Sequence, residues 1–133
     1  MKVKNVMITL DKFPVISESL FFKEALDEMS FKKIGIACII DESFHLKGIL
    51  TDGDIRRKLL NVQKPLSALF VDDCIEHAIL SPIVINPETP LIDAIEIMGS
   101  KKIWDLPVVD EEGKLIGLLH LHPVVKKLLN NSL

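Results

Sequence analysis

The sequence predicts a mixed α/β (α+β) fold built from two tandem repeats, each with the order strand, helix, strand, strand, helix. The chain matches itself when it is displaced so that Val15 falls on Val84. Within each copy, short apolar runs typical of strands alternate with segments whose apolar residues recur at helical spacing. Apolar residues make up 48% of the chain and aromatic residues only 5%, which favours an aliphatic, layered α/β core.

The repeat holds without a gap from Val15 to Leu129. Two copies are fewer than the three or more that a solenoid needs, so we expect two related units packed about a pseudo-twofold axis. The predicted boundaries are 3–60 for the first repeat, 61–80 for a connecting segment and 81–129 for the second repeat. The clearest matches are Ala25 with Ala94, Met29 with Met98, Asp41 with Asp110, and Gly48 with Gly117.

Each repeat begins with a short strand followed by an amphipathic helix. The predicted strands are residues 15–16 and 83–85. In the second copy, Thr89 is the expected N-cap and Pro90 the first helical residue; Ser19 stands near the matching place in the first copy. The apolar stripes that predict the helices are Phe22, Ala25, Leu26 and Met29 in the first copy, and Leu91, Ala94, Ile95 and Met98 in the second.

Two further strands and a helix complete each repeat. Residues 37–40 and 107–109 read as strands buried on both faces. The turn that follows residues 107–109 contains Gly113, and glycine accepts a positive φ. Phe44 occupies the matching place in the first copy, and we expect a different backbone path there because a bulky residue disfavours positive φ. Strands at 46–50 and 115–119 then lead into helices that end near Leu60 and Leu129.

The connecting segment at residues 61–80 is predicted to be ordered rather than a flexible linker. Its apolar residues indicate a short amphipathic helix packed on the core. These residues are Leu66, Leu69, Phe70, Ile75 and Ile79.

Composition excludes several classes of function. The net charge of −3 comes with interspersed signs and no basic stripe, so we expect no nucleic-acid partner. Residues 1–16 lack a basic-then-apolar leader, and no apolar run approaches ~18 residues, so no membrane role is expected. Cys38 and Cys74 match no metal spacing, and a cytoplasmic setting is predicted. The sequence shows neither a nucleophile paired with a base nor a set of metal ligands, so we do not expect an enzyme.

The segment at residues 48–57 carries the most specific chemistry. An apolar strand ends in Thr51, Asp52, Gly53 and Asp54 where a helix begins, and free backbone N–H groups at such a junction suit a phosphate. The carboxylate of Asp54 could accept hydrogen bonds from a sugar diol. Thr and Asp are also ordinary N-caps. Because the matched helix starts without these residues, we infer that the fold does not require Thr51 and Asp54, and that Asp52 is the cap.

The repeat unit, closed by the pattern Gly-apolar-apolar-Thr-x-x-Asp, resembles the CBS domain, named for cystathionine β-synthase. The resemblance covers residues 3–129 as one CBS pair. Residues 13–16, 51–57 and 117–122 look most like the C-terminal CBS pair of bacterial arabinose-5-phosphate isomerases, which supply Kdo. A sugar nucleotidyltransferase CBS pair is the alternative relative. The resemblance places isomerase chemistry on a separate sugar-isomerase domain, so this chain is expected not to be an enzyme itself.

The resemblance implies a ligand in a cleft between the repeats, with Thr51 on phosphate and Asp54 on the ribose hydroxyls. Asp52 and Gly53 lie within the same motif. We expect the base to lie against strand entries at Ile36, Ala37, Leu106 and Pro107. The implied regulatory ligand is AMP, ATP or a CMP-sugar, with no required cofactor.

The second copy departs from this pattern. His120 replaces Thr51 and Pro123 replaces Asp54, so its cleft is not a standard nucleoside site. His120 and His122 are expected to contact a phosphate or a sugar acid; a metal pair would lack a third ligand, and no metal is predicted. Trp104 interrupts the repeat and either stacks on a base or contacts a partner chain. The resemblance implies a homodimer of CBS pairs, and a dimerisation module without a ligand is the competing hypothesis.

Overall fold

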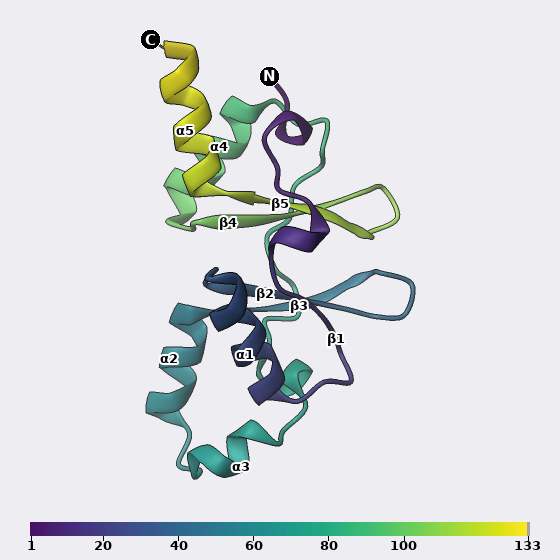
Figure 1. The fold of residues 1–133 in the computed structure, drawn as a ribbon, viewed down its shortest axis with the longest axis vertical. Coiled ribbons are helices and arrows are strands. Elements are labelled where there is room, and N and C mark those ends of the chain that lie inside the picture. The colour runs from purple at the N-terminus through teal and green to yellow at the C-terminus, as the bar shows by residue number, and fades with distance from the viewer. Residues whose placement is uncertain (133) are drawn as a thin grey trace. The chain divides into compact units, whose positions relative to one another are not determined.

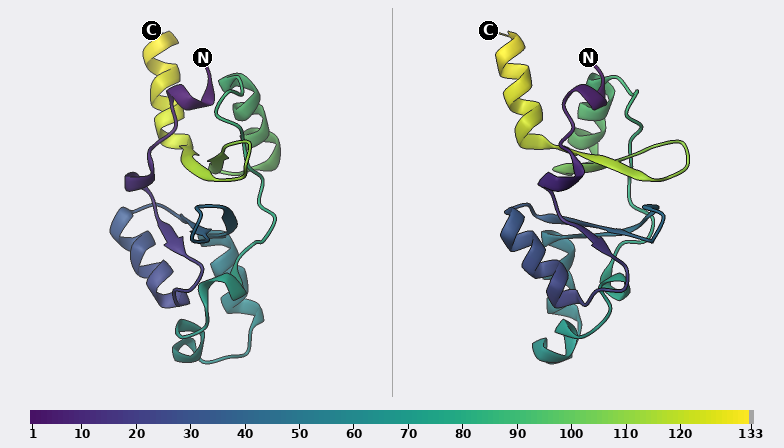
Figure 2. Two further views of the ribbon diagram at one scale, coloured as in Figure 1. Left: turned by 90° about the vertical axis from the view of Figure 1, so that its right-hand side faces the viewer. Right: turned by 45° about the vertical axis from the view of Figure 1, so that its right-hand side comes forward.

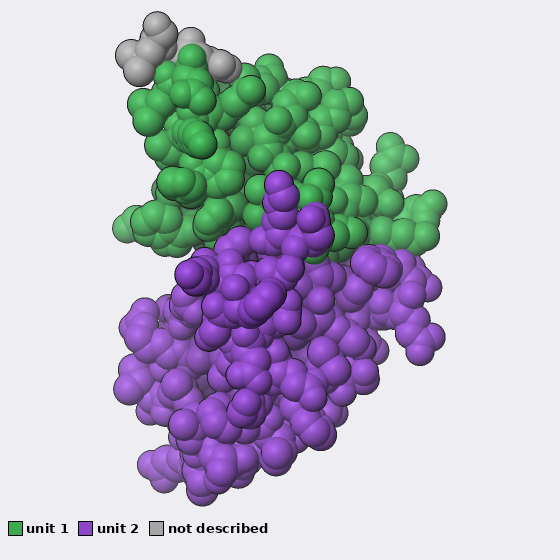
Figure 3. Space-filling view, in the orientation of Figure 1, with its two compact units in different colours: residues 1–10, 83–133 green, residues 11–82 purple. Residues whose placement is uncertain are grey.

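The computed structural model describes residues 1–132, with side chains through residue 130. It confirms a mixed α/β chain with two small sheets (Figure 1). Two compact units are present: residues 11–82 form one, and residues 1–10 with residues 83–133 form the other (Figure 3). The 11–82 unit and the 83–133 unit, as we call them, are described separately. No helix among the described residues is long and apolar enough to cross a membrane.

The 11–82 unit contains a three-stranded sheet in the order β1-β2-β3, with β1 parallel and β3 antiparallel to the central strand β2. The helices α1 and α2 lie on one face of this sheet (Figure 2). Its elements are β1 (Val15–Ser17), α1 (Phe22–Lys32), β2 (Ile36–Ile40), β3 (Leu46–Thr51), α2 (Asp52–Asn61) and α3 (Leu66–Phe70), followed by a 3₁₀ turn at Cys74–His77.

The core of this unit confirms the predicted patterns. All five residues of β2 are buried, as a continuous apolar run predicts. The predicted stripe of α1 is buried through Phe22, Ala25 and Met29. The connecting segment is ordered as expected: α3 contributes the buried Leu69 to the same core.

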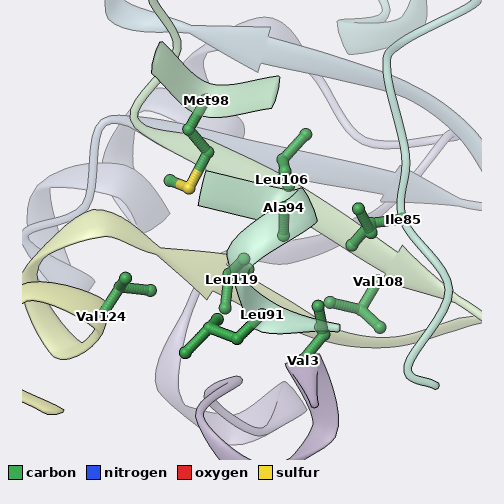
Figure 4. Close-up of a cluster of buried hydrophobic side chains, with 9 residues drawn as sticks. All are labelled: Val3, Ile85, Leu91, Ala94, Met98, Leu106, Val108, Leu119 and Val124. Carbon is green, nitrogen blue, oxygen red and sulfur yellow. The ribbon is translucent and has the colours of Figure 1, made fainter. Parts of the chain in front are cut away.

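The 83–133 unit has a two-stranded antiparallel sheet, β4-β5, with α4 and α5 on one face (Figure 1). Val3, from the N-terminal segment, packs into its aliphatic core together with Ala94, Leu106 and Leu119 (Figure 4). The elements are α4 (Leu91–Lys101), β4 (Asp105–Val109), β5 (Leu115–His120) and α5 (Leu121–Ser132), with a 3₁₀ turn at Val3–Asn5.

The prediction of a strand at residues 83–85 was wrong, because only one β-bridge forms there. Ile85 pairs in parallel with Val108, donating its N–H to the carbonyl of Pro107 and accepting from Val109. Pro82 and Pro87 flank this segment, and a proline has no N–H to extend a ladder. The pairing therefore stops after one residue.

In each unit, a short segment from one repeat pairs with the last strand of the other repeat. Ile8 forms a two-hydrogen-bond bridge with Leu118 of β5, and Ile79 forms one with Ile49 of β3. A Cβ on Gly48 would lie 2.9 Å from the carbonyl oxygen of Ile79, and a Cβ on Gly117 would lie 3.0 Å from that of Ile8. Gly48 and Gly117 therefore allow close approach of the segments around Ile79 and Ile8. We call these two segments the exchanged segments, because each pairs with a strand of the other repeat. The compact units consequently cut across the repeats seen in the sequence.

The turn at Phe44 contradicts the expectation of a different backbone path. Phe44 has φ +68°, in the same region as Gly113 at φ +81°. In each turn an aspartate oxygen accepts two backbone N–H groups: Asp41 from Ser43 and His45, and Asp110 from Glu112 and Lys114. The aspartate fixes the turn, and the Phe44 side chain remains largely exposed, so the positive φ is tolerated.

Three helix starts also differ from prediction. Phe21 rather than Ser19 is the N-cap of α1, and Pro90 rather than Thr89 is the N-cap of α4; neither provides a side-chain cap. Thr51 rather than Asp52 caps α2. At α1 and α4, backbone hydrogen bonds from other segments replace the expected side-chain caps: Phe22 donates to the carbonyl of Asp72, and Leu91 to that of Met1.

Candidate functional site

The predicted motif lies where β3 runs directly into α2. Leu50 is fully buried and anchors the end of the strand, and Thr51 follows as the N-cap. The hydroxyl oxygen of Thr51 accepts the N–H of Asp54 at 3.2 Å. Thr51 therefore caps α2, the role that the sequence assigned to Asp52, and the inference that the fold does not require Thr51 stays a prediction.

The structure brings Thr51 and Asp54 together, as predicted. The Thr51 hydroxyl donates to Oδ2 of Asp54 at 2.6 Å, and the guanidinium of Arg57 donates to Oδ1 at 2.6 Å. The side chain of Asp54 is 21% exposed. A carboxylate has about four acceptor positions, so Asp54 retains capacity for further donors.

Asp52 and Gly53 have structural roles other than holding a phosphate. The N–H of Asp52 donates to the carbonyl of Gly35 at 3.0 Å, which ties α2 to the residue before β2. A Cβ on Gly53 would lie 3.2 Å from a guanidinium nitrogen of Arg57. The bare Cα of Gly53 thus leaves room for the Arg57 side chain over the first turn of α2.

A pocket of about 390 Å³ lies within the 11–82 unit, a size typical of small-molecule sites. One wall is formed by α2, which provides a carboxylate, two cations and an amide. The other wall is the end of the connecting segment. The lining residues are Asp54, Arg57, Lys58, Asn61, Val62, His77, Ala78 and Ile79.

His77, at the end of the connecting segment, has a side chain that is only 9% exposed. Its Nε2 lies 2.9 Å from Asp72, its ring packs 4.9 Å from that of Phe22, and its buried Nδ1 has no hydrogen-bond partner among the described residues. Hydrogen bonds from Lys64 and then His77 hold the pKa of Asp72 below its usual value. This network fixes the wall of the pocket.

A potential metal-ligand group overlaps this network. Asp72, Glu76 and His77 place ligand atoms within 4.8 Å of one another. The ammonium of Lys64 lies 2.9 and 2.8 Å from the two oxygens of Asp72. Lys64 thus contacts both carboxylate oxygens of Asp72, and a metal ion at this group would have to displace it.

Of the candidate walls on the strands, Ile36 and Ala37 lie beside the motif, whereas Leu106 and Pro107 belong to β4 of the 83–133 unit. Ile36 is the cross-strand partner of Thr51, and Ala37 that of Leu50. The side chains of Ala37 and Leu106 belong to the cores of their respective units, and Pro107 follows on β4. Ligand contacts from Ala37 and Leu106 would therefore have to come from their backbones.

The matching junction of the second repeat has different chemistry. His120 ends β5, and its Nδ1 lies 2.6 Å from Oδ1 of Asp105, its cross-strand partner. His122 lies exposed in the first turn of α5. The carbonyl of Trp104 accepts the N–H of Leu121, and the Trp104 side chain is 69% exposed.

Sequence reasoning missed the pairings of Arg57 and Asp105. Arg57 follows Asp54 by three positions on a helix, a spacing at which side chains meet. Asp105 lies opposite His120 once the register of the β4–β5 pair is known. The first signal was readable from the sequence, whereas the second required the strand register.

Sequence relatives match nearly the whole of this chain. An uncharacterised protein of Helicobacter pylori is 37% identical over 127 residues, which cover 94% of this chain and 36% of that protein. Arabinose 5-phosphate isomerase KdsD of Salmonella typhi is 30% identical over 128 residues, covering 95% and 37% of the two chains. This chain thus spans just over a third of the length of these relatives.

Solved structures give the same picture. CBSX2 in complex with AMP matches with a TM-score of 0.86 and 30% identity, over 99% of this chain and 98% of that one. CBSX2 from Arabidopsis thaliana matches with a TM-score of 0.84 and 28% identity, over 98% and 96%. The family model for the CBS domain matches residues 3–61 and again residues 75–129. This chain therefore belongs to the CBS domain family and carries two copies of the domain as a CBS pair.

Proposed function

We propose that this chain is a regulatory module that binds a ribonucleotide at Thr51 and Asp54. The observation that carries the proposal is the Asp54 carboxylate, which is fixed by Thr51, is partly exposed and lines a pocket of about 390 Å³. A carboxylate that accepts both hydroxyls of a ribose selects against ligands without that diol. In the first turn of α2 the N–H groups of Asp52 and Asp54 donate to Gly35 and Thr51, so a phosphate there would be met by the N–H of Gly53.

Other predicted contacts complete the proposed site. Asp52 and Gly53 contribute the backbone of the first turn of α2. Ile36 and Ala37 provide a wall for the base, and Leu106 and Pro107 hold the matching positions beside the junction of the second repeat. At that second junction, His120, oriented by Asp105, and His122 meet an anionic group of a ligand.

Adenine nucleotides are the first candidates, because CBSX2 was crystallised with AMP. A CMP-sugar is the second, since the likeness to KdsD suggests feedback by an activated sugar product. We infer that the module biases an attached sugar-isomerase domain in a longer, isomerase-like protein. A sugar nucleotidyltransferase is the alternative parent.

Isothermal titration calorimetry with AMP, ATP, CMP and CMP-Kdo tests the proposal. We expect saturable binding of at least one of these ligands and a loss of about tenfold or more in affinity in Asp54→Ala, since a charged hydrogen-bond acceptor is removed. Asp93→Ala, which alters an exposed acid in the first turn of α4, is the matched control and should bind as the wild type does. No binding of any ligand, or unchanged affinity in Asp54→Ala, would overturn it.

A homodimerisation role has its own supporting observation. The helices α2 and α5 expose leucines at matching positions, and none of the residues of α2 is buried. Paired apolar patches of this kind often mark interfaces. The residues are Leu59 and Leu60 on α2, and Leu128 and Leu129 on α5. Sedimentation velocity should show a dimer that Leu60→Lys weakens; a wild-type monomer at all concentrations would contradict this role.

A further inference from the structure

In this structure Arg57 binds the carboxylate of Asp54, the group that we propose contacts the ribose. Its guanidinium donates to Oδ1 of Asp54 at 2.6 Å, while Thr51 occupies Oδ2. The Arg57 side chain is 59% exposed, whereas that of Asp54 is 21% exposed. The arginine therefore covers the carboxylate from the solvent side.

The position of Arg57 depends on its surroundings on α2. Gly53 leaves the space in which the guanidinium lies, because a Cβ at this position would come within 3.2 Å of a guanidinium nitrogen. Arg57 and Lys58 line the same pocket as Asp54. When Arg57 leaves Asp54, the pocket lining still carries two cations, Arg57 and Lys58, against the single carboxylate of Asp54, a setting that favours an anion.

We propose that Arg57 is a specificity-determining residue that makes the site prefer a nucleotide over the corresponding nucleoside. This inference rests on the proposed nucleotide function. The ribose diol replaces Arg57 on Asp54, and the released guanidinium pairs with the phosphate of the same ligand. A nucleoside breaks the Arg57–Asp54 pair without supplying an anion, whereas a nucleotide breaks one pair and forms another.

The expected changes in affinity distinguish this exchange of Arg57 between Asp54 and the phosphate from a simple phosphate contact. The Arg57–Asp54 pair is partly exposed, and such pairs have small coupling, so its removal should tighten nucleoside binding by about two- to fivefold. Loss of a guanidinium–phosphate contact should weaken nucleotide binding by about tenfold. A simple phosphate contact would weaken nucleotide binding only and leave nucleoside binding unchanged.

The test is calorimetry of two pairs of ligands, AMP with adenosine and CMP with cytidine, on the wild type, Arg57→Gln and Arg56→Gln. Arg56 is the adjacent exposed arginine, so its variant has the same net charge as Arg57→Gln. For the pair whose nucleotide binds the wild type, we expect Arg57→Gln to weaken nucleotide binding about tenfold and to tighten nucleoside binding about two- to fivefold. Arg56→Gln should change neither.

Three results would overturn the inference alone: unchanged or weaker nucleoside binding in Arg57→Gln, unchanged nucleotide binding in that variant, or the same pattern in Arg56→Gln. In each case the wild type still binds a nucleotide, and the proposed function stands. Failure of all four ligands to bind the wild type would overturn the inference together with adenine or cytidine nucleotide binding.

Discussion

The two junctions between a strand and its following helix share a backbone and differ in chemistry. The N–H of Asp52 donates to the carbonyl of Gly35, and the N–H of Leu121 donates in the same way to the carbonyl of Trp104. At the first junction Thr51, Asp54 and Arg57 form one local network. At the second, His120 pairs across the sheet with Asp105. The repeat therefore specifies the scaffold, while the side chains placed on it decide the ligand.

If the shared scaffold is equally important in both repeats, matching core truncations should cost the same. Leu50 and Leu119 occupy equivalent positions and are both fully buried. We expect Leu50→Ala and Leu119→Ala each to lower the free energy of unfolding by about 2–5 kcal/mol. Urea denaturation followed by circular dichroism measures this, and a cost below ~1 kcal/mol in one repeat alone would show that the two cores are not equivalent.

The exchanged segments offer a sharper comparison. A Cβ at Gly48 meets the backbone oxygen of Ile79 at 2.9 Å, whereas a Cβ at Gly117 meets Sδ of Met7 at 2.7 Å and the oxygen of Ile8 at 3.0 Å. We expect Gly48→Ala and Gly117→Ala each to cost about 1–3 kcal/mol, because backbone atoms must move.

Amide hydrogen exchange locates the damage. Protection should fall at Ile79 in Gly48→Ala and at Ile8 in Gly117→Ala. Gly99→Ala is the matched control, since no atom of the described residues lies within 4 Å of a Cβ at that helical position, its own helix backbone and chain neighbours aside. Retained protection in both glycine variants would show that the bridges tolerate a methyl group.

The two turns allow an exchange of residues. Phe44→Gly gives the first turn a glycine at its positive-φ position, as the second turn has at Gly113. Because glycine adopts positive φ more readily than phenylalanine, this change should stabilise the protein by up to about 1 kcal/mol. Gly113→Ala should destabilise it by about 1 kcal/mol, because alanine disfavours positive φ. Thermal unfolding measures both, and a destabilised Phe44→Gly would mean that contacts of the phenyl ring outweigh the backbone term.

The smallest expected effect concerns acid. Hydrogen bonds from Lys2 and then Lys4 lower the pKa of Glu88 from 4.5 to about 2. Because the folded pKa is depressed, the stabilisation is present above about pH 4.5 and is lost as the pH falls toward about 2.

Melting temperatures measured across this pH range should therefore fall slightly less in Glu88→Gln than in the wild type. The effect should be small because these side chains are about half exposed. Addition of salt should reduce the difference further. An identical pH profile in the variant would show that the pair contributes nothing to stability.

Periodicity predicted the helices and most strands, because a buried face leaves a clear pattern in both copies. The positive φ of Phe44 was not predictable from its residue type, since Asp41 and its hydrogen bonds decide the turn. The same holds for Lys33 and Lys102, which end α1 and α4 with positive φ where glycine is more usual. At such positions, short-range hydrogen bonds outweigh the conformational preference of the residue type.

The candidate site was predictable in its centre and not at its edge. The motif identified Thr51 and Asp54, and the structure places them in contact. The wall formed by His77, Ala78 and Ile79 depends on a segment that no motif marks. Its position follows from the Ile49–Ile79 bridge, which no local pattern in the chain reveals.

The exchanged segments also determine which fragment of the chain can be transplanted. A fragment cut at the end of the first repeat, near residue 60, would lack Ile79 and with it one wall of the pocket. Residues 11–82 instead form a contiguous piece that contains the motif, the pocket and its bridge. The other unit is assembled from the two ends of the chain. The unit of modular reuse is therefore offset from the unit of sequence duplication.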